Sequence, residues 1–358
     1  MHNNQAIPFN KENFKQIFSK EFALVIIISV PGALIADFLN VPLAWFLGPM
    51  LITSLISLVG IKIKMPKLVL SIVLILLGLY IGNYVDKSLF SQIHQWAWTS
   101  LIMLAYIIVS VLLVSKYLQK FSGYGKKTSI FSAAPGALGP LLILAEDEKS
   151  DLSRVATSHL IRLIIIITVF PFVVNSLYDA TDVKLIETIS ENQNTSNLFI
   201  LIIVSIFLIF IFDRLKIPAA LLSGTLVASG FLQITEIATY KLPPDIIDYC
   251  LLILGSSVGC RFADKTFNEI AKNALHSFVA TFFLVFLGLL AAFVASLVID
   301  KNFFTLLLSY CPGGIYEVAV IAIFFNLDPE FVSFHHIIRL LIILFVVPII
   351  LKLLKNLN

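Results

Sequence analysis

Charged residues are scarce in this chain. Asp, Glu, Lys and Arg make up only 13% of its 358 residues, whereas 59% are hydrophobic and the mean hydropathy is +0.97. A water-soluble protein of this size would need far more charge to cover its surface. Apolar segments of about twenty residues follow one another along nearly the whole chain, each long enough to cross ~30 Å of hydrocarbon as a helix. We therefore expect an all-α polytopic membrane protein.

Other absences exclude several functions. The only cysteines are Cys250, Cys260 and Cys311, and their spacing fits neither a metal site nor a disulfide framework, so we interpret them as packing residues. The chain has no Walker-type phosphate loop, which disfavours ATP as the energy source. Its net charge of +3 is too small and too dispersed to indicate nucleic-acid binding. The polar first twenty residues predict no cleavable signal sequence.

The chain contains an internal duplication. Residues 132–171 align without a gap to residues 309–348, and one spacing of 177 residues separates Pro135 from Pro312 and Arg162 from Arg339. The similarity extends upstream to the LLGLYIGN and ILGSSVGC segments. Each half is therefore one structural unit. The predicted organisation is an N-terminal tail (1–21), repeat 1 (22–178), a polar linker (179–196) and repeat 2 (197–358).

Basic residues predict that the two repeats have opposite orientations. We place six apolar segments in each half: 22–40, 42–60, 67–85, 97–118, 129–146 and 152–177, then 197–213, 217–235, 246–263, 274–299, 303–326 and 330–354. Lys and Arg follow the second and fourth segments of repeat 1 but the first and third segments of repeat 2. Because Lys and Arg in short loops stay in the cytoplasm, the repeats are expected to be inverted. Both termini then lie on the cytoplasmic side of the inner membrane.

Inversion requires an odd number of crossings in each repeat. The fifth segments carry Pro135-Gly136 and Pro312-Gly313-Gly314 near their middles, where Pro removes a backbone donor and Gly permits turns that a continuous helix forbids. We expect five spanning helices plus one broken or re-entrant segment in each repeat, which gives 10–12 membrane segments in all. A broken segment that spans fully, with another segment that does not, is the alternative.

The last helix of each repeat carries charge where a bilayer disfavours it. Arg162 and Arg339 each lie eleven residues after an Asp, so at ~1.5 Å per residue each guanidinium group is about 16 Å along its helix. An Arg near the bilayer centre costs about 2.5–3.5 kcal/mol. His159 and His336 precede the arginines by three residues and share their helix face. We predict that these four residues bind solute or ions; the alternatives are arginines that clamp carbonyl groups of a broken helix and imidazoles that are only structural.

The broken segments are predicted to supply the rest of the site. Half-helix ends expose amide or carbonyl groups that bind ions, so Pro135, Gly136 and the Pro312–Gly314 turn join the site. Glu317 lies five residues after Pro312 and is expected to pair with an Arg, coordinate a cation or carry a proton. The equivalent residue of the first repeat is Pro140, so carboxylate chemistry would be one-sided.

A resemblance to a known family follows from these motifs. The combination of PLAWFLG, a GxxxG-like helix, a PGG break followed by Glu, and a helix with HxxR resembles the membrane AbrB-duplication family over about residues 25–352. The stretch SYCPGGIYE is also similar to the CPGG break of the bile acid:sodium symporter group, which implies the inverted-repeat fold of cation/proton antiporters. The first repeat departs from the PGGxxE pattern, with Pro135-Gly136-Ala137 followed by Gly139-Pro140.

The function expected from the sequence is secondary transport. Arg162 and Arg339 favour a small anionic organic solute, and Glu317 with the histidines favours coupling to protons or Na⁺. We expect no enzyme activity and no cofactor; the expected partners are the bilayer, the solute and a second copy of the chain, without nucleic acid. The resemblance offers two alternatives through older family names: a membrane-embedded regulator of gene expression, and a copper monooxygenase, for which the six histidines form a poor ligand set.

Overall fold

The computed structural model describes residues 11–85, 87, 89–178, 195–243, 245–263 and 265–356. Residues 1–10 of the predicted tail and residues 179–194 of the predicted linker lie outside this set. Throughout the described residues the regular secondary structure is helical, and no strand occurs there. The all-α prediction is confirmed.

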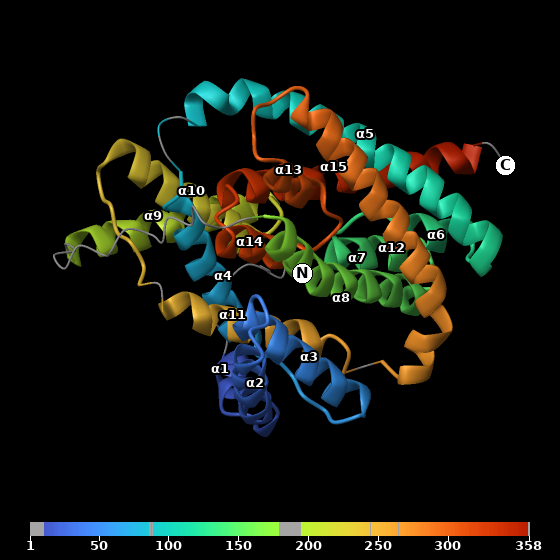
Figure 1. Ribbon diagram of the computed structural model, residues 1–358, viewed down its shortest axis with the longest axis horizontal. Helices are drawn as coiled ribbons and strands as arrows, with labels where there is room; N and C mark the ends of the chain where they lie inside the picture. The colour runs from blue at the N-terminus through green and yellow to red at the C-terminus, as the bar shows by residue number, and fades with distance from the viewer. Residues whose placement is uncertain are drawn as a thin grey trace. The chain divides into compact units, whose positions relative to one another are not determined.

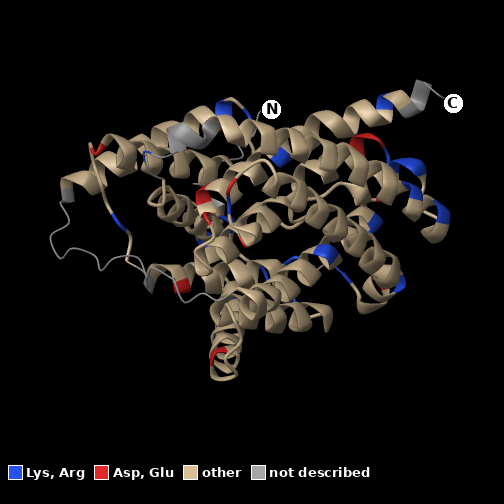
Figure 2. Ribbon diagram, turned by 45° about the horizontal axis from the view of Figure 1, so that its top comes forward, with Lys and Arg blue, Asp and Glu red and all other residues tan. Residues whose placement is uncertain are grey.

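Six helices of the described chain are long and apolar enough to cross a membrane: 13–38, 94–122, 152–177, 196–214, 267–296 and 329–353. Large apolar side chains on these helices are exposed, as at Phe207 (61%) and Phe282 (62%), which suits a surface covered by lipid. Figure 2 shows long stretches of helix that carry neither acidic nor basic residues. The chain is therefore a multi-pass membrane protein.

The helices form two compact units, and each unit takes helices from both predicted repeats. Unit 1 comprises Met1–Ser91, Asn175–Thr266 and Ile323–Glu330. Unit 2 comprises Gln92–Val174, Phe267–Ala322 and Phe331–Asn358. The first three apolar segments of each repeat thus belong to unit 1, and the last three belong mainly to unit 2.

Unit 1 is a bundle of paired helices (Figure 1). Its helices are α1 (Lys11–Ile17), α2 (Lys20–Phe38), α3 (Ala44–Leu58), α4 (Lys67–Gly82), α9 (Thr195–Arg214), α10 (Ala220–Thr235) and α11 (Asp245–Cys260). Helix α3 of repeat 1 packs against α11 of repeat 2, and α4 packs in the same way against α10. Equivalent helices of the two repeats therefore make equivalent contacts.

Glycines allow these helix pairs to approach closely. A Cβ atom on Gly78 of α4 would lie 2.0 Å from the Thr225 hydroxyl oxygen, and one on Gly255 of α11 would lie 2.2 Å from the carbonyl oxygen of Phe46. Gly78 and Gly255 occupy equivalent positions of the duplication. Backbones separated by so little space are typical of small-residue packing between membrane helices. The GxxxG-like motifs serve packing in unit 1.

Unit 2 contains both broken segments (Figure 1). Its helices are α5 (Leu89–Ser122), α6 (Lys126–Ala133), α7 (Leu138–Asp147), α8 (Leu152–Leu177), α12 (Phe267–Ser296), α13 (Phe303–Tyr310), α14 (Ile315–Phe324) and α15 (Pro329–Asn356). The predicted Pro-Gly interruptions fall between α6 and α7 and between α13 and α14. A single helix would have continued through these apolar segments if Pro and Gly had not ended it.

Candidate functional site

The first break separates α6 from α7 and leaves the carbonyl groups at the end of α6 without helical partners. Arg162 on α8 donates to these carbonyls: Nη1 lies 2.6 Å from the Ala134 oxygen, and Nη2 donates to the Ser132 oxygen. His159 Nε2 lies 2.9 Å from the Phe131 oxygen. Pro135 is buried within the turn, and Gly136 adopts a φ of 106°, which favours glycine. Helix α8 thus holds the end of α6.

The second break has a similar arrangement, in which one of the two arginine acceptors lies within the turn. Arg339 on α15 donates from Nη1 to the Cys311 oxygen and, at 2.6 Å, from Nη2 to the Gly313 oxygen. His336 Nε2 lies 3.0 Å from the Leu308 oxygen. Each guanidinium group therefore places positive charge at the negative end of a half-helix. The clamp alternative describes these contacts correctly, and solute binding by the arginines stays a prediction.

The two breaks meet within unit 2. A Cβ on Gly136 of the first break would lie 2.8 Å from Nη2 of Arg339, the arginine that clamps the second break. A Cβ on Gly313 of the second break would lie 3.3 Å from Ile166 of α8. Tyr106 of α5 lies within electrostatic range of both Arg162 and Arg339. Arg162, Arg339, Glu317, His159 and His336 are all buried.

The half-helices that follow the breaks differ at their N-termini. In the second repeat the Glu317 carboxylate folds back over Gly314, where a Cβ would lie only 1.9 Å from Oε2. A side chain at position 314 would displace the carboxylate from this place. The first repeat has Ala137 and Pro140 at the equivalent positions, and α7 has no acidic residue in its first turn and no side-chain cap. An acidic group therefore occupies only one of the two N-termini.

Several buried polar atoms of unit 2 have no hydrogen-bond partner among the described residues: Ser132 Oγ, Thr157 Oγ1, Ser333 Oγ, His336 Nδ1 and the Nε atoms of Arg162 and Arg339. Because His336 Nε2 faces a carbonyl oxygen it must donate, which leaves Nδ1 as an acceptor. Buried polar groups normally have partners, so such atoms indicate a place for water or solute.

Sequence reasoning missed Tyr106, Ser132, Thr157 and Ser333. The relevant signal was available: each is a polar residue within an otherwise apolar helix or beside a break. Hydroxyl groups are common in membrane helices, where they bond to their own backbone, so this signal alone does not separate site residues from structural ones.

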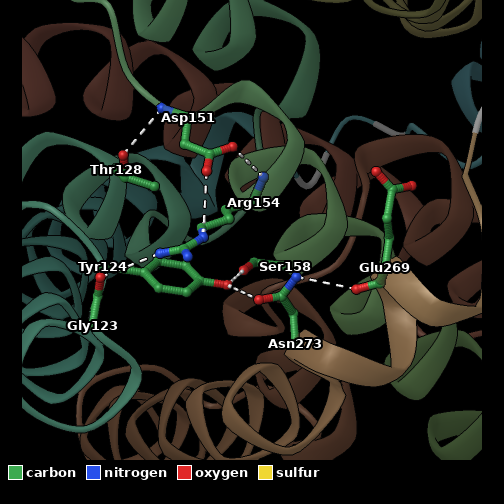
Figure 3. Close-up of polar contacts among 8 residues, drawn as sticks. All are labelled: Gly123, Tyr124, Thr128, Asp151, Arg154, Ser158, Glu269 and Asn273. Carbon is green, nitrogen blue, oxygen red and sulfur yellow. Dashed lines mark hydrogen bonds and ion pairs between the residues drawn. The ribbon is translucent and has the colours of Figure 1, made fainter.

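A second polar cluster surrounds Tyr124 in the turn between α5 and α6 (Figure 3). Its hydroxyl group lies 3.3 Å from Ser158 Oγ on α8 and donates, also at 3.3 Å, to Asn273 Oδ1 on α12. The guanidinium group of Arg154 lies 5.1 Å from the centre of the Tyr124 ring. Burial raises the pKa of Tyr124, so the phenol stays protonated and able to donate. This cluster joins α8, the helix of Arg162, to α12.

The equivalent positions in the second repeat keep the cation–π contact but exchange its partners. Lys301 takes the place of Tyr124 and Phe331 takes the place of Arg154, and the Lys301 ammonium lies 5.7 Å from the centre of the Phe331 ring. Both repeats therefore have a cation–π contact at this pair of positions, with the cation and the ring exchanged.

The described residues contain no group of three or more His, Cys, Asp or Glu side chains placed to hold a metal ion. Within them Cys250, Cys260 and Cys311 are free thiols.

Comparison with known proteins supports the resemblance. Residues 2–87 and 45–355 match the family described as transition state regulatory protein AbrB. The chain belongs to this AbrB family. It is 22% identical, over 93% of both chains, to a protein of Bacillus subtilis (strain 168) named "Uncharacterized protein YhjN". It is also 22% identical to the "Putative regulator AbrB" of Escherichia coli (strain K12), over 86% of this chain and 89% of that one. No solved structure matches the chain.

Proposed function

We propose that this AbrB-family membrane protein is a secondary transporter that moves a small anionic organic solute by alternating access. The observation that carries the proposal is the meeting of two interrupted helices around a buried guanidinium group, that of Arg339. Interrupted helices expose backbone dipoles inside a membrane protein, and transporters use such ends to bind solutes and coupling ions. Unit 2 holds all of this machinery, so it is the unit that we propose to carry the solute.

The buried charges have different roles in this proposal. Arg162 and Arg339 hold the ends of α6 and α13, and their positive charge attracts the anion. Glu317 and the free Nδ1 acceptor of His336 are the candidates for coupling to protons or Na⁺. The protein acts without a catalytic step or a resident cofactor, in the cytoplasmic membrane, with both termini in the cytoplasm and a second copy as its partner.

Transport by purified protein tests the proposal. The full chain is reconstituted into liposomes on a solid-supported membrane, and currents are recorded after addition of acetate, pyruvate, benzoate, succinate or glutamate, with and without Na⁺ and across a pH gradient. We expect currents with at least one carboxylate that are lost in Arg339→Gln and Glu317→Gln. The matched control is Lys87→Gln, because Lys87 is exposed and forms an ion pair with the exposed Glu236. Currents of wild-type size in both site variants would contradict the proposal. So would the absence of currents from the wild type with every solute and gradient.

A second candidate function is regulation of gene expression, which the name of the Escherichia coli relative favours. The two functions are separable in a deletion strain complemented with wild type or Arg339→Gln. A regulator that acts through solute movement loses its effect on transcript levels with the variant. A variant that is present in the membrane and restores transcript levels fully would favour regulation that is independent of the site.

A further inference from the structure

We propose that the N-terminus of α7, together with Arg339, binds the negatively charged head of the solute, and that the site takes one monoanionic group, such as a single carboxylate. This inference rests on the proposed function, because only a transporter would move the bound anion as its solute. As a statement about anion binding, it can be tested without transport.

The formal charges at the two breaks give an excess of one positive charge. Arg162 and Arg339 contribute two positive charges, and Glu317 contributes one negative charge. The half-helix ends add equal and opposite partial charges, because each break has one C-terminus and one N-terminus. An uncompensated charge away from water is costly, so a bound monoanion would stabilise unit 2, whereas a dianion would leave a negative charge over.

Only one of the two N-termini is open to an anion. Glu317 already lies against Gly314 at the start of α14, where its carboxylate complements the helix dipole. At the start of α7 the amides of Leu138 and Gly139 have no side-chain cap, whereas Pro140 has no N–H, and Gly139 and Pro140 are exposed. A Cβ on Gly139 would meet no atom within 4 Å, so a ligand has room there. Open amide groups at a helix N-terminus are a common binding site for carboxylates.

Arg339 lies close to this open helix end. Its side chain is fully buried, and its Nε atom has no hydrogen-bond partner in the described part of the chain. A Cβ on Gly136 would lie 3.2 Å from this Nε atom, and Gly136 is two residues before the first residue of α7. A guanidinium group with a free N–H thus lies beside the open helix end. Arg339 joins the clamp of the second break to the anion site of the first.

Thermal unfolding of the purified full chain in detergent tests the inference. Acetate and benzoate serve as monoanions and succinate as the dianion, each titrated in a zwitterionic buffer without other small anions. We expect the monoanions to raise the unfolding temperature of the wild type more than succinate does. Equal shifts with succinate, or no shift with either monoanion, would overturn the proposal.

Gly139→Asp places a carboxylate in the first turn of α7, and Gly139→Asn is the matched neutral control. We expect the Asp variant to unfold at a higher temperature than the Asn variant without added anion, and to lose at least about tenfold in acetate affinity, which corresponds to about 1.4 kcal/mol. The Asn variant keeps the wild-type response. Equal unfolding temperatures and equal acetate responses in the two variants would refute the location of the site.

Glu317→Gln tests the charge balance separately. Removal of the negative charge leaves two positive charges over, so the preference is expected to move from acetate toward succinate by about tenfold. An unchanged preference would contradict the charge argument. These binding results are independent of transport: monoanion binding without currents would overturn the transporter alone, whereas currents that Gly139→Asp leaves intact would overturn only the anion site.

Discussion

The two breaks of unit 2 have similar clamps and differ in the half-helix that follows. At both breaks an Arg and a His from the last helix of the repeat contact carbonyl groups at the end of the preceding half-helix, and Arg339 also donates to the Gly313 carbonyl within the turn. After the second break Glu317 lies over Gly314, whereas after the first break the equivalent positions are Pro140 and Ala137. The breaks thus share a C-terminal half and differ in the N-terminal half.

This difference has a physical reason. Carbonyl groups at an interrupted helix need donors whatever the protein does, because an unsatisfied buried polar group costs about 1–3 kcal/mol. The clamps are therefore constrained in both repeats. The N-terminal ends are free to diverge as long as each positive helix end meets a negative partner. Glu317 is such a partner within the chain, and in our proposal the solute is the other.

The largest expected effect comes from removing a clamp. Arg339→Met leaves the Cys311 and Gly313 carbonyls without their donor, and Arg162→Met does the same to Ser132 and Ala134. Two unsatisfied carbonyls cost about 2–6 kcal/mol in the free energy of unfolding. Arg339→Met is expected to cost more, because Arg339 also lies beside Gly136 and interacts electrostatically with Glu317.

Thermal unfolding of the two purified variants measures the difference. Arg162→Lys and Arg339→Lys are the controls, since a Lys keeps the charge but cannot span two carbonyls at once. We expect the order of stability wild type, Lys variant, Met variant at both positions. Equal losses for Arg162→Met and Arg339→Met would show that Arg339 does not link the two breaks.

A smaller effect is expected at the N-cap of the second half-helix. Gly314→Ala introduces a Cβ 1.9 Å from Glu317 Oε2, so the carboxylate must leave its place over the helix end. A carboxylate at a helix N-terminus contributes up to about 2 kcal/mol, so its displacement is expected to cost about that much. A double-mutant cycle with Glu317→Ala measures this contribution, because the cost of Gly314→Ala disappears once the carboxylate is absent. An unchanged cost in the Glu317→Ala background would assign the effect to backbone strain instead.

The sequence predicted the helices and their interruptions well. Apolar segments, Pro-Gly pairs and the 177-residue spacing are local or periodic signals, and the helices of the described chain follow them closely. Burial of Arg162 and Arg339 also followed from their position in apolar helices. The compact units were not foreseen, because they combine halves of both repeats and depend on contacts between distant segments.

The atomic partners of the site residues were harder to predict. Arg162 bonds to carbonyl groups nearly thirty residues away, and every residue has a carbonyl, so no residue type signals this contact. The sequence could name the clamp only as an alternative. The difference between the two N-termini, in contrast, was visible in the sequence. The second repeat has Gly314 and Glu317, and the first has Ala137 and Pro140, which departs from the PGGxxE pattern. The position of the Glu317 carboxylate could not be predicted, because the carboxylate folds back over Gly314, which has no Cβ.

The smallest expected effect concerns Ala137, the N-cap residue of α7. It has a φ of 62° in the left-handed region, which costs a residue with a Cβ about 1–2 kcal/mol, whereas Gly occupies this region without strain. Ala137→Gly also gives the unfolded chain more freedom, so we expect a net stabilisation of about 1 kcal/mol or less.

Ala134→Gly is the matched control for Ala137→Gly at the same break. Ala134 has a φ of −63°, where Gly relieves no strain. The variant loses a buried methyl group and gives the unfolded chain more freedom, so it is expected to unfold at a lower temperature than the wild type. Opposite shifts in unfolding temperature at two alanines three residues apart would assign the strain to the N-cap of α7. Loss of stability in both variants would instead mean that the first break tolerates Ala137 without strain, and that its difference from the second break resides in the missing carboxylate alone.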